Sequence, residues 1–202
     1  MVEKEPFRIG ILASTKGTDL QAIIDEMKEG KMPGIELACV ISNKESAYAL
    51  ERASSQGYEA IFVNPKNQTR EEFDSHVAEL LEKHKVDLVV LIGYMRILSE
   101  PFVKQFKNRI INVHPALIPK FCGPSFFGAS VHEEVLKAGE TETGMTIHYV
   151  DEGCDTGGII LQKTCPVTPD DTTDTLKDKV QALEKKWYPE VIRQLAAKKD
   201  TQ

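Results

Sequence analysis

The sequence predicts an α/β protein with a doubly wound, mostly parallel β-sheet, an antiparallel C-terminal portion and a long terminal helix. Apolar runs of strand length alternate with stretches of helical periodicity through the first half, which favours parallel strands joined by crossover helices. Residues 86–92 (VDLVVLI) are almost wholly apolar, which is typical of a central strand buried on both faces. Later, two strand-like runs follow one another without a helix between them, which predicts a hairpin.

The first half of the chain supplies the parallel unit. Phe7–Ala13 is an apolar run that ends in a small polar loop, and residues 18–29 then carry apolar side chains at helical spacing. Ser46 is the expected N-cap of the second helix. The alternation continues with strands at residues 35–41, 58–63, 86–92 and 109–113, and with helices at residues 46–56, 69–84 and 101–106.

The second half changes character. A loop rich in glycine, proline and phenylalanine covers residues 115–130. The elements expected after it are a helix at residues 131–138 and strands at 143–150 and 158–167. The terminal helix, residues 172–197, is expected to be interrupted near Pro189, because proline lacks the N–H that a helix interior needs.

Composition limits the class of partner. The net charge is −6 and no long block of Lys and Arg occurs, so small-molecule partners are favoured over nucleic acid. No apolar run approaches the ~20 residues of a membrane span, and the charged first residues lack the apolar core of a signal peptide. The spacing of the four cysteines fits neither a zinc motif nor a disulfide framework. We therefore expect a cytoplasmic monomer or homodimer with no metal and no membrane partner.

Three polar or glycine-containing segments follow predicted strands. They are residues 14–19, 93–98 and 112–119. Open α/β sheets bind ligands at the carboxyl ends of their strands, so these segments are expected to form one binding site.

Residues 112–115 (NVHP) carry residue types that suit carbonyl chemistry. Asn112 and His114 are two apart on a strand, so both point to the same face. An amide can donate to an oxyanion without titrating, and an imidazole can stabilise it as imidazolium or move a proton. An acid among residues 151–155 could orient His114 and raise its pKa. The alternative is that His114 only caps the end of the strand.

A direct transfer needs the fewest assumptions. No serine or cysteine lies in a nucleophile-elbow sequence, so attack by the acceptor's own amine is simpler than a covalent intermediate.

Several segments closely resemble the folate-dependent formyltransferases. In chain order they are ILASTKGTDLQAIID, VISNKESAYALERA, VVLIGYMRILS, INVHPALIP and GMTIHYVDEGCDTGGIILQ. The resemblance implies a Rossmann-like formyltransferase fold in a single domain, residues 1–202, with a nucleotide- and phosphate-binding half (1–107) and a catalytic and folate-binding half (108–202). It implies 10-formyltetrahydrofolate as co-substrate. The members most alike formylate phosphoribosylglycinamide in purine biosynthesis.

The resemblance also implies catalytic roles. Asn112 matches the asparagine that stabilises the oxyanion, and His114 matches the histidine that donates a proton. Asp155 matches the aspartate that pairs with that histidine and orders a water for proton transfer.

Binding roles follow in the same way. Gly17, Thr18 and Asp19 match the loop that holds the substrate's phosphate, and Glu184 matches the glutamate that binds its ribose hydroxyls. A glycine-bearing turn before a helix offers free N–H groups to a phosphate. The residues that match the folate site are Arg70, Met95, Arg96, Ile97, Leu98, Asn112, Asp151, Glu152, Gly153, Cys154 and Asp155. Without the resemblance, Glu184 and Arg70 would be interpreted as solvated helix charges.

Two positions in the phosphate loop depart from the family pattern. Thr15 replaces a glycine and Asp19 replaces an asparagine. A carboxylate beside a phosphate is repulsive, on the order of 1–4 kcal/mol at about 4 Å, which Lys16 could offset. The loop at residues 121–130 is also longer than in compact members, and its Phe126 and Phe127 could line the cleft or pack the loop.

Three other functions remain open. A formyltetrahydrofolate hydrolase would use water in place of the amine, but related hydrolases carry an extra N-terminal domain, and only six residues precede the first strand here. Formylation of initiator tRNA is disfavoured by the acidic balance and by the additional C-terminal domain of those relatives. A non-catalytic folate- or nucleotide-binding module is supported by Asp19 and opposed by the intact set Asn112, His114 and Asp155.

Overall fold

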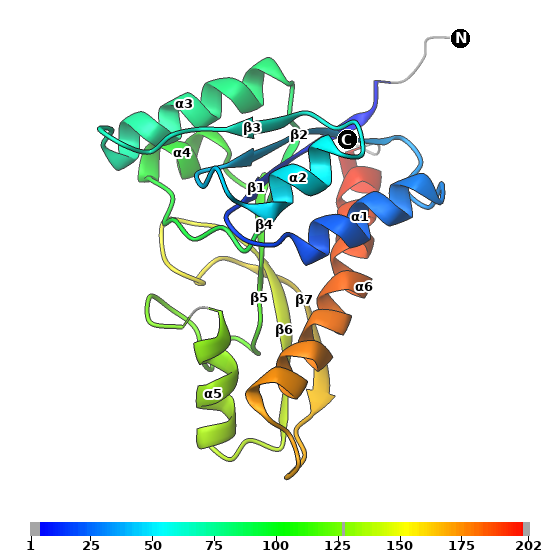
Figure 1. The fold of residues 1–202 in the computed structure, drawn as a ribbon, viewed down its shortest axis with the longest axis vertical. Helices are drawn as coiled ribbons and strands as arrows, with labels where there is room; N and C mark the ends of the chain where they lie inside the picture. Colours follow the sequence, from blue (N-terminus) through cyan, green and yellow to red (C-terminus); the bar gives the residue numbers. More distant parts are fainter. Residues whose placement is uncertain (1–4, 127, 200–202) are drawn as a thin grey trace.

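A seven-stranded sheet forms the centre of the molecule, with strand order β3-β2-β1-β4-β5-β6-β7 (Figure 1). The computed structural model describes residues 5–126 and 128–199. The strands are β1 (Phe7–Ala13), β2 (Ile35–Ser42), β3 (Ala60–Phe62), β4 (Leu88–Ile92), β5 (Ile110–His114), β6 (Glu142–Tyr149) and β7 (Ile159–Pro166). The helices are α1 (Thr18–Lys28), α2 (Tyr48–Ser54), α3 (Arg70–Lys83), α4 (Glu100–Gln105), α5 (Ala129–Lys137) and α6 (Thr173–Lys199).

The direction of the strands confirms the predicted fold class. Strands β1 to β5 pair in parallel, whereas β6 pairs antiparallel with both β5 and β7. The antiparallel ladder between β5 and β6 includes Asn112, which lies opposite His148. The C-terminal hairpin is therefore attached directly to the strand that carries the NVHP motif.

Two apolar layers sandwich the sheet, and β4 contributes to both. Leu88, Val90 and Ile92 pack with α1, α2 and α6 on one face, whereas Val89 and Leu91 pack with α3 and α4 on the other. All five residues of β4 are buried, as its continuous apolar run predicts. In Figure 1, α3 and α4 lie on the opposite side of the sheet from α1 and α6.

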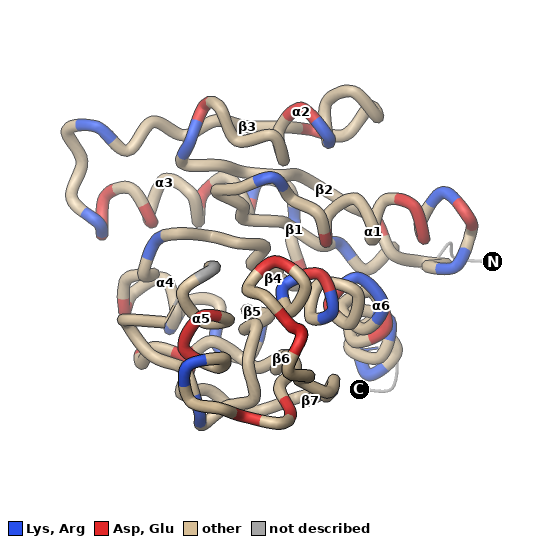
Figure 2. The backbone as a smooth tube through the Cα atoms, turned by 60° about the horizontal axis from the view of Figure 1, so that its bottom comes forward, with Lys and Arg blue, Asp and Glu red and all other residues tan. Residues whose placement is uncertain are grey.

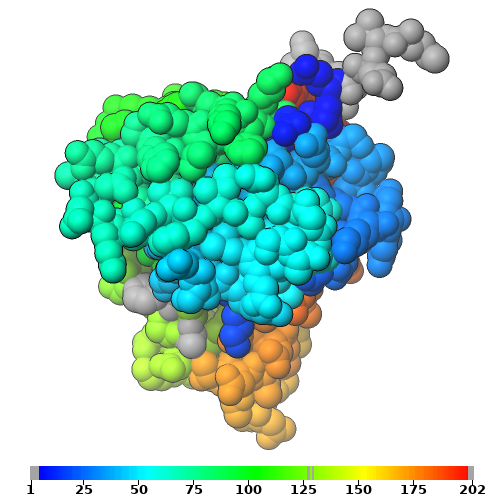
Figure 3. All heavy atoms as spheres, turned by 45° about the horizontal axis from the view of Figure 1, so that its top comes forward, coloured from blue at the N-terminus to red at the C-terminus, as the bar shows by residue number. Residues whose placement is uncertain are grey.

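The molecule has a wider and a narrower part. Figure 3 shows α1, α2 and α3 side by side over the wider part, with α5 and the beginning of α6 over the narrower part. Acidic and basic residues are interspersed along these helices (Figure 2). No helix in the described residues is long and apolar enough to cross a membrane.

The predicted interruption at Pro189 is wrong, because α6 runs without a break over its 27 residues. Pro189 is buried, and the preceding Tyr188 is fully buried. The Tyr188 hydroxyl donates to the carbonyl oxygens of Leu91 at 2.9 Å and Ile111 at 3.1 Å. This packing keeps the helix continuous, although Pro189 has no N–H to donate to the helix.

The predicted cap at Ser46 is also wrong. The N-cap of α2 is Ala47, and no side chain caps that helix. By contrast, α3 begins at a capping box in which the Thr69 hydroxyl accepts from Glu72 N–H and the Glu72 carboxylate accepts from Thr69 N–H.

Candidate active site

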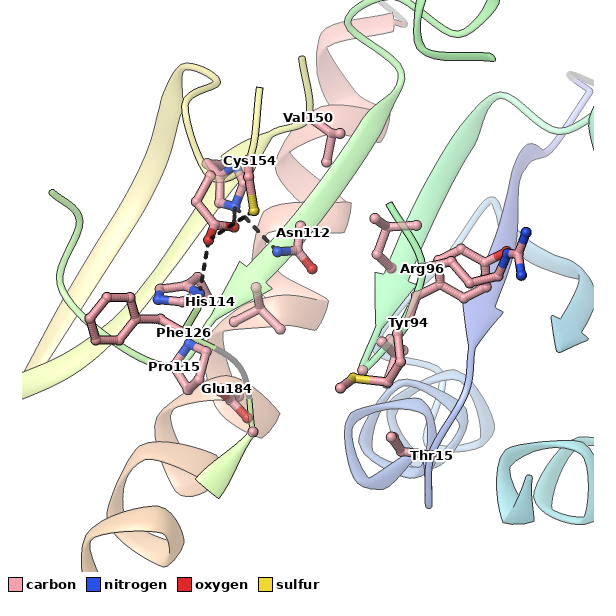
Figure 4. Close-up of a pocket in the computed structure, with 18 of the residues that line it drawn as sticks. Thr15, Tyr94, Arg96, Asn112, His114, Pro115, Phe126, Val150, Cys154 and Glu184 are labelled. Carbon is pink, nitrogen blue, oxygen red and sulfur yellow. Dashed lines mark hydrogen bonds and ion pairs between the residues drawn. The ribbon is translucent and has the colours of Figure 1, made fainter. Parts of the chain in front are cut away.

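A cavity of about 740 Å³ opens at the carboxyl ends of β1, β4 and β5. The segments that follow these three strands all line it, as the topology predicts. Residues 150–155 between β6 and β7 close one side, and Lys177, Gln181 and Glu184 of α6 line another part of it. In Figure 4, Asn112 and His114 lie on one wall and Thr15, Tyr94 and Arg96 lie across from them.

His114 is held from both sides of its ring. Its Nε2 donates to the carbonyl oxygen of Phe121 at 2.7 Å, and its Nδ1 lies 3.6 Å from Asp155 Oδ2. Because a carbonyl can only accept, the neutral imidazole carries its hydrogen on Nε2. Nδ1 is then free to take a proton beside the Asp155 carboxylate.

The pKa of His114 lies below its usual value, contrary to the expectation from sequence. Burial lowers this pKa most, and the Asp155 charge and the Phe121 hydrogen bond raise it by less. His114 is only 4% exposed, so loss of solvent outweighs the neighbouring carboxylate. The imidazole is therefore neutral at rest and must gain a proton to act as an acid.

Asp155 is fixed as a carboxylate by its surroundings. Burial raises its pKa, but the contact with the His148 ring, the hydrogen bond from the Gly123 N–H and the interaction with His114 when that ring is protonated outweigh burial and lower the pKa overall. The Gly123 N–H lies 2.9 Å from Asp155 Oδ2. Asp155 also has φ 58, a left-handed conformation that turns its side chain toward β5.

Sequence reasoning missed His148, which joins Asn112 to Asp155. His148 Nδ1 donates to the Tyr149 carbonyl at 2.8 Å, and its Nε2 lies 3.3 Å from Asn112 Nδ2 and 3.5 Å from Asp155 Oδ1. It is 2% exposed. The available signal was its place in the β6 run, but only the hairpin register puts it opposite Asn112.

A second missed histidine, His132 of α5, also lines the cavity. Burial and the charge of Lys177 lower its pKa to about 4. Its Nδ1 has no hydrogen-bond partner among the described residues. His132 is thus a neutral ring near the positive charge of Lys177.

The loop after β1 enters α1 through Gly17, and no side chain caps the start of that helix. Gly17 precedes α1 with φ 65, and a Cβ at this position would lie 2.9 Å from the Ala49 Cβ. Thr15 packs against Gly93, where a Cβ would lie 2.4 Å from the Thr15 hydroxyl oxygen. Both contacts fix the path of the loop and leave the first turn of α1 facing the cavity.

Two carboxyl groups are buried at this end of the cavity. Asp19 is 6% exposed and Glu184 is 7% exposed. Burial raises the pKa of Asp19 to about 6, although the Lys185 charge lowers it. Burial and the charge of Asp19 raise the pKa of Glu184 to about 8, again against Lys185.

The segment after β4 offers apolar surface to a ligand. Met95 is 43% exposed and Ile97 is 59% exposed, and both line the cavity with Leu98. Arg96 also lines it, but its guanidinium lies over the Phe73 ring at 4.2 Å and so turns toward α3.

The structure does not bring Arg70 to the cavity. Its side chain is half exposed at the start of α3, where it pairs with Glu71 at 3.4 Å. Every other residue that the resemblance assigns to binding or catalysis lines the cavity. Among the described residues, no group of three or more His, Cys, Asp or Glu could hold a metal ion.

Phe126 fits both of its predicted roles, because it lines the cavity and packs edge-to-face on Phe121 at 6.2 Å. Phe127 lies outside the described residues.

Comparisons with known proteins agree with this arrangement. The profile of the family described as formyl transferase matches residues 7–192. The glycinamide ribonucleotide transformylase 1 structure from Symbiobacterium toebii is 41% identical, with a TM-score of 0.89, over 96% of this chain and 90% of that one. Phosphoribosylglycinamide formyltransferase from Haemophilus influenzae is 38% identical over 92% of this chain and 85% of its own length.

Longer relatives match as well. The trifunctional purine biosynthetic protein adenosine-3 of Drosophila pseudoobscura is 40% identical over 98% of this chain. The chain spans only 14% of the length of that protein, and 19% of its human counterpart.

Proposed function

Because the chain belongs to the formyl transferase family, we propose that it transfers the formyl group of 10-formyltetrahydrofolate to the amine of phosphoribosylglycinamide, in de novo purine biosynthesis. The observation that carries the proposal is the set Asn112, His114 and Asp155 on one wall of the cavity, with His114 Nδ1 3.6 Å from the Asp155 carboxylate. The names of similar full-length relatives support the choice of acceptor.

In the proposed reaction, the acceptor amine attacks the formyl carbon and forms a carbon–nitrogen bond. The tetrahedral oxyanion accepts a hydrogen bond from the Asn112 amide, and His114 stabilises it after gaining a proton. The bond to the folate nitrogen then breaks, and the proton released by the amine passes to that nitrogen. Asp155 stabilises the imidazolium and orders a water on this proton path.

Each substrate has its own part of the cavity in this proposal. The phosphate binds at Gly17, Thr18 and Asp19, and Glu184 accepts the ribose hydroxyls. The pterin pairs with the backbone of residues 151–155, and the apolar side chains after β4 cover it. Arg70 would act only at the rim of the folate site. Holding both substrates together supplies much of the acceleration by proximity.

A turnover assay tests the proposal. Purified protein is mixed with 10-formyltetrahydrofolate, with and without phosphoribosylglycinamide, and released tetrahydrofolate is measured. We expect release only when the amine is present. Release without the amine would indicate a hydrolase, and no release under either condition would indicate a binding module; both results contradict the proposal.

Variants at two histidines make the test specific. His114→Ala should abolish most turnover, because the charge on the oxyanion then loses its partner. His76→Ala, at an exposed position on α3, is the matched control and should leave turnover unchanged. Near-normal turnover in His114→Ala would contradict the mechanism.

A further inference from the structure

Asp19 and Glu184 come from helices that pack side by side. Asp19 lies in the first turn of α1 and Glu184 lies in the middle of α6, and the two helices are in contact (Figure 1). Both side chains are more than nine-tenths buried and both line the cavity. Two acidic groups are thus enclosed at the end of the cavity where the acceptor's phosphate is proposed to bind.

The pair has little to neutralise it. Asp19 Oδ1 has no hydrogen-bond partner among the described residues. The Tyr188 hydroxyl, one turn beyond Glu184, is already committed to the carbonyls of Leu91 and Ile111. An ionised carboxylate in such a place is costly unless it is paired, so the neutral form is favoured.

Of the cations nearby, Lys16 and Lys177 line the cavity, whereas Lys185 acts from outside it. Lys185 lowers the pKa of both carboxyl groups, but it is exposed on the outer side of α6. From α2, the Arg52 guanidinium is engaged with the Lys16 carbonyl at 2.7 Å and Gln21 Oε1 at 3.1 Å. Lys16 itself is exposed, and Lys177 lines the cavity two turns before Glu184.

We propose that Asp19 and Glu184 share one proton, and that this proton allows the phosphate of the acceptor to bind beside them. The proposal rests on the proposed function, since it defines the charge of the same site. With both groups ionised, a phosphate would meet two negative charges in a buried space. With one group protonated, its O–H donates to a phosphate or hydroxyl oxygen and the other still accepts from ribose.

The consequence is that acceptor binding depends on pH. If the pair must keep one proton, the fraction of protein that can bind the acceptor falls up to tenfold for each pH unit above the pKa at which that proton is lost. The affinity for the acceptor should therefore be kept between the raised pKa values of about 6 and about 8, where the pair holds one proton, and should fall as the pH rises above about 8. Binding of the folate, at the other part of the cavity, should not follow this titration.

The experiment compares KM for phosphoribosylglycinamide in three proteins over a pH range that begins at about 6 and extends above about 8. In the unaltered protein, KM should rise as the pH rises through about 8, where the pair loses its last proton. In Asp19→Asn, which has the same shape and no second charge, the profile should flatten to the phosphate's own titration near about pH 6. The matched control is Asp25→Asn, an exposed position on the same helix, which should behave like the unaltered protein.

The outcomes separate this inference from the proposed function. A flat KM profile in the unaltered protein, an unchanged profile in Asp19→Asn, or loss of turnover in Asp19→Asn at every pH would overturn it. Absence of amine-dependent turnover in the unaltered protein would instead overturn the proposed function. In that case, the pH dependence of the melting temperature of Asp19→Asn relative to Asp25→Asn still reports the proton, because it needs no substrate.

Discussion

Replacing Asp155 by asparagine tests the proposed catalytic pair most directly. The side chain keeps its shape but loses the charge 3.6 Å from His114 Nδ1. At that separation and an effective dielectric of about 20, two unit charges interact by about 4 to 5 kcal/mol. Burial of His114 opposes this attraction. We expect kcat to fall on the order of 100- to 1000-fold, equivalent to about 3 to 4 kcal/mol.

The pH dependence sharpens this prediction. The Asp155 charge raises the pKa of His114 against burial, so the variant should have a lower pKa at His114. The limb of the kcat profile that reports this histidine should therefore move to lower pH. Steady-state assays over a pH series measure both effects, and Asp170→Asn, an exposed change between β7 and α6, is the control. A change confined to KM for the folate would refute the reasoning, because Asp155 would then only position the donor.

Three further predictions concern stability and binding. Burial raises the pKa of Asp19 from 3.8 to about 6, so the stabilising contribution of its proton is complete below about pH 4 and is lost as the pH rises through 6. The free energy of unfolding of Asp19→Asn should therefore increase by about 3 kcal/mol relative to that of the unaltered protein over this interval, as measured by urea unfolding at several pH values. A difference that does not change with pH would contradict this prediction. Gly10→Ala should lower the free energy of unfolding by about 1–3 kcal/mol, because the new Cβ would lie 2.6 Å from Leu81 Cδ2. Combining it with Leu81→Ala should destabilise the protein by less than the sum of the two single changes. Strict additivity in this double-mutant cycle would show that the contact is relieved elsewhere. Gly17→Ala should cost about 1–2 kcal/mol in thermal unfolding, because φ is 65, and should raise KM for the acceptor more than KM for the folate; equal effects on both would argue against a phosphate loop.

Much of the fold could be predicted because its signals are local. The apolar run of β4 and the alternation before it fix the parallel sheet, and the topology then brings the three loops to one edge. The sequence around Pro189 predicts a break that does not occur, because the effect of a proline depends on tertiary packing and Tyr188 holds the helix against the sheet. Ser46 does not cap α2, because the cap propensity of a residue does not specify where the helix begins.

The site was predictable only in part, for a similar reason. Asn112 and His114 share a strand, so spacing alone put them together, whereas His148 reaches them through the register of the hairpin. The direction of the His114 pKa depends on how much solvent the fold removes, which no local pattern gives. Arg70 shows the reverse case, in which a matching residue lies outside the cavity.

The hydrogen bonds of the Tyr188 hydroxyl affect which connections of the chain can change in length. It bonds to Leu91 and Ile111, the residues next to Ile92 and Asn112 in the cavity wall, while Glu184 lies one turn earlier on the same helix. The position of Glu184 relative to β5 is thus set by the Tyr188 contact and not by the length of the connection that leads into α6. Insertions or deletions at residues 167–172 should then leave the spacing between the two substrates unchanged, so this connection can differ in length without altering the chemistry.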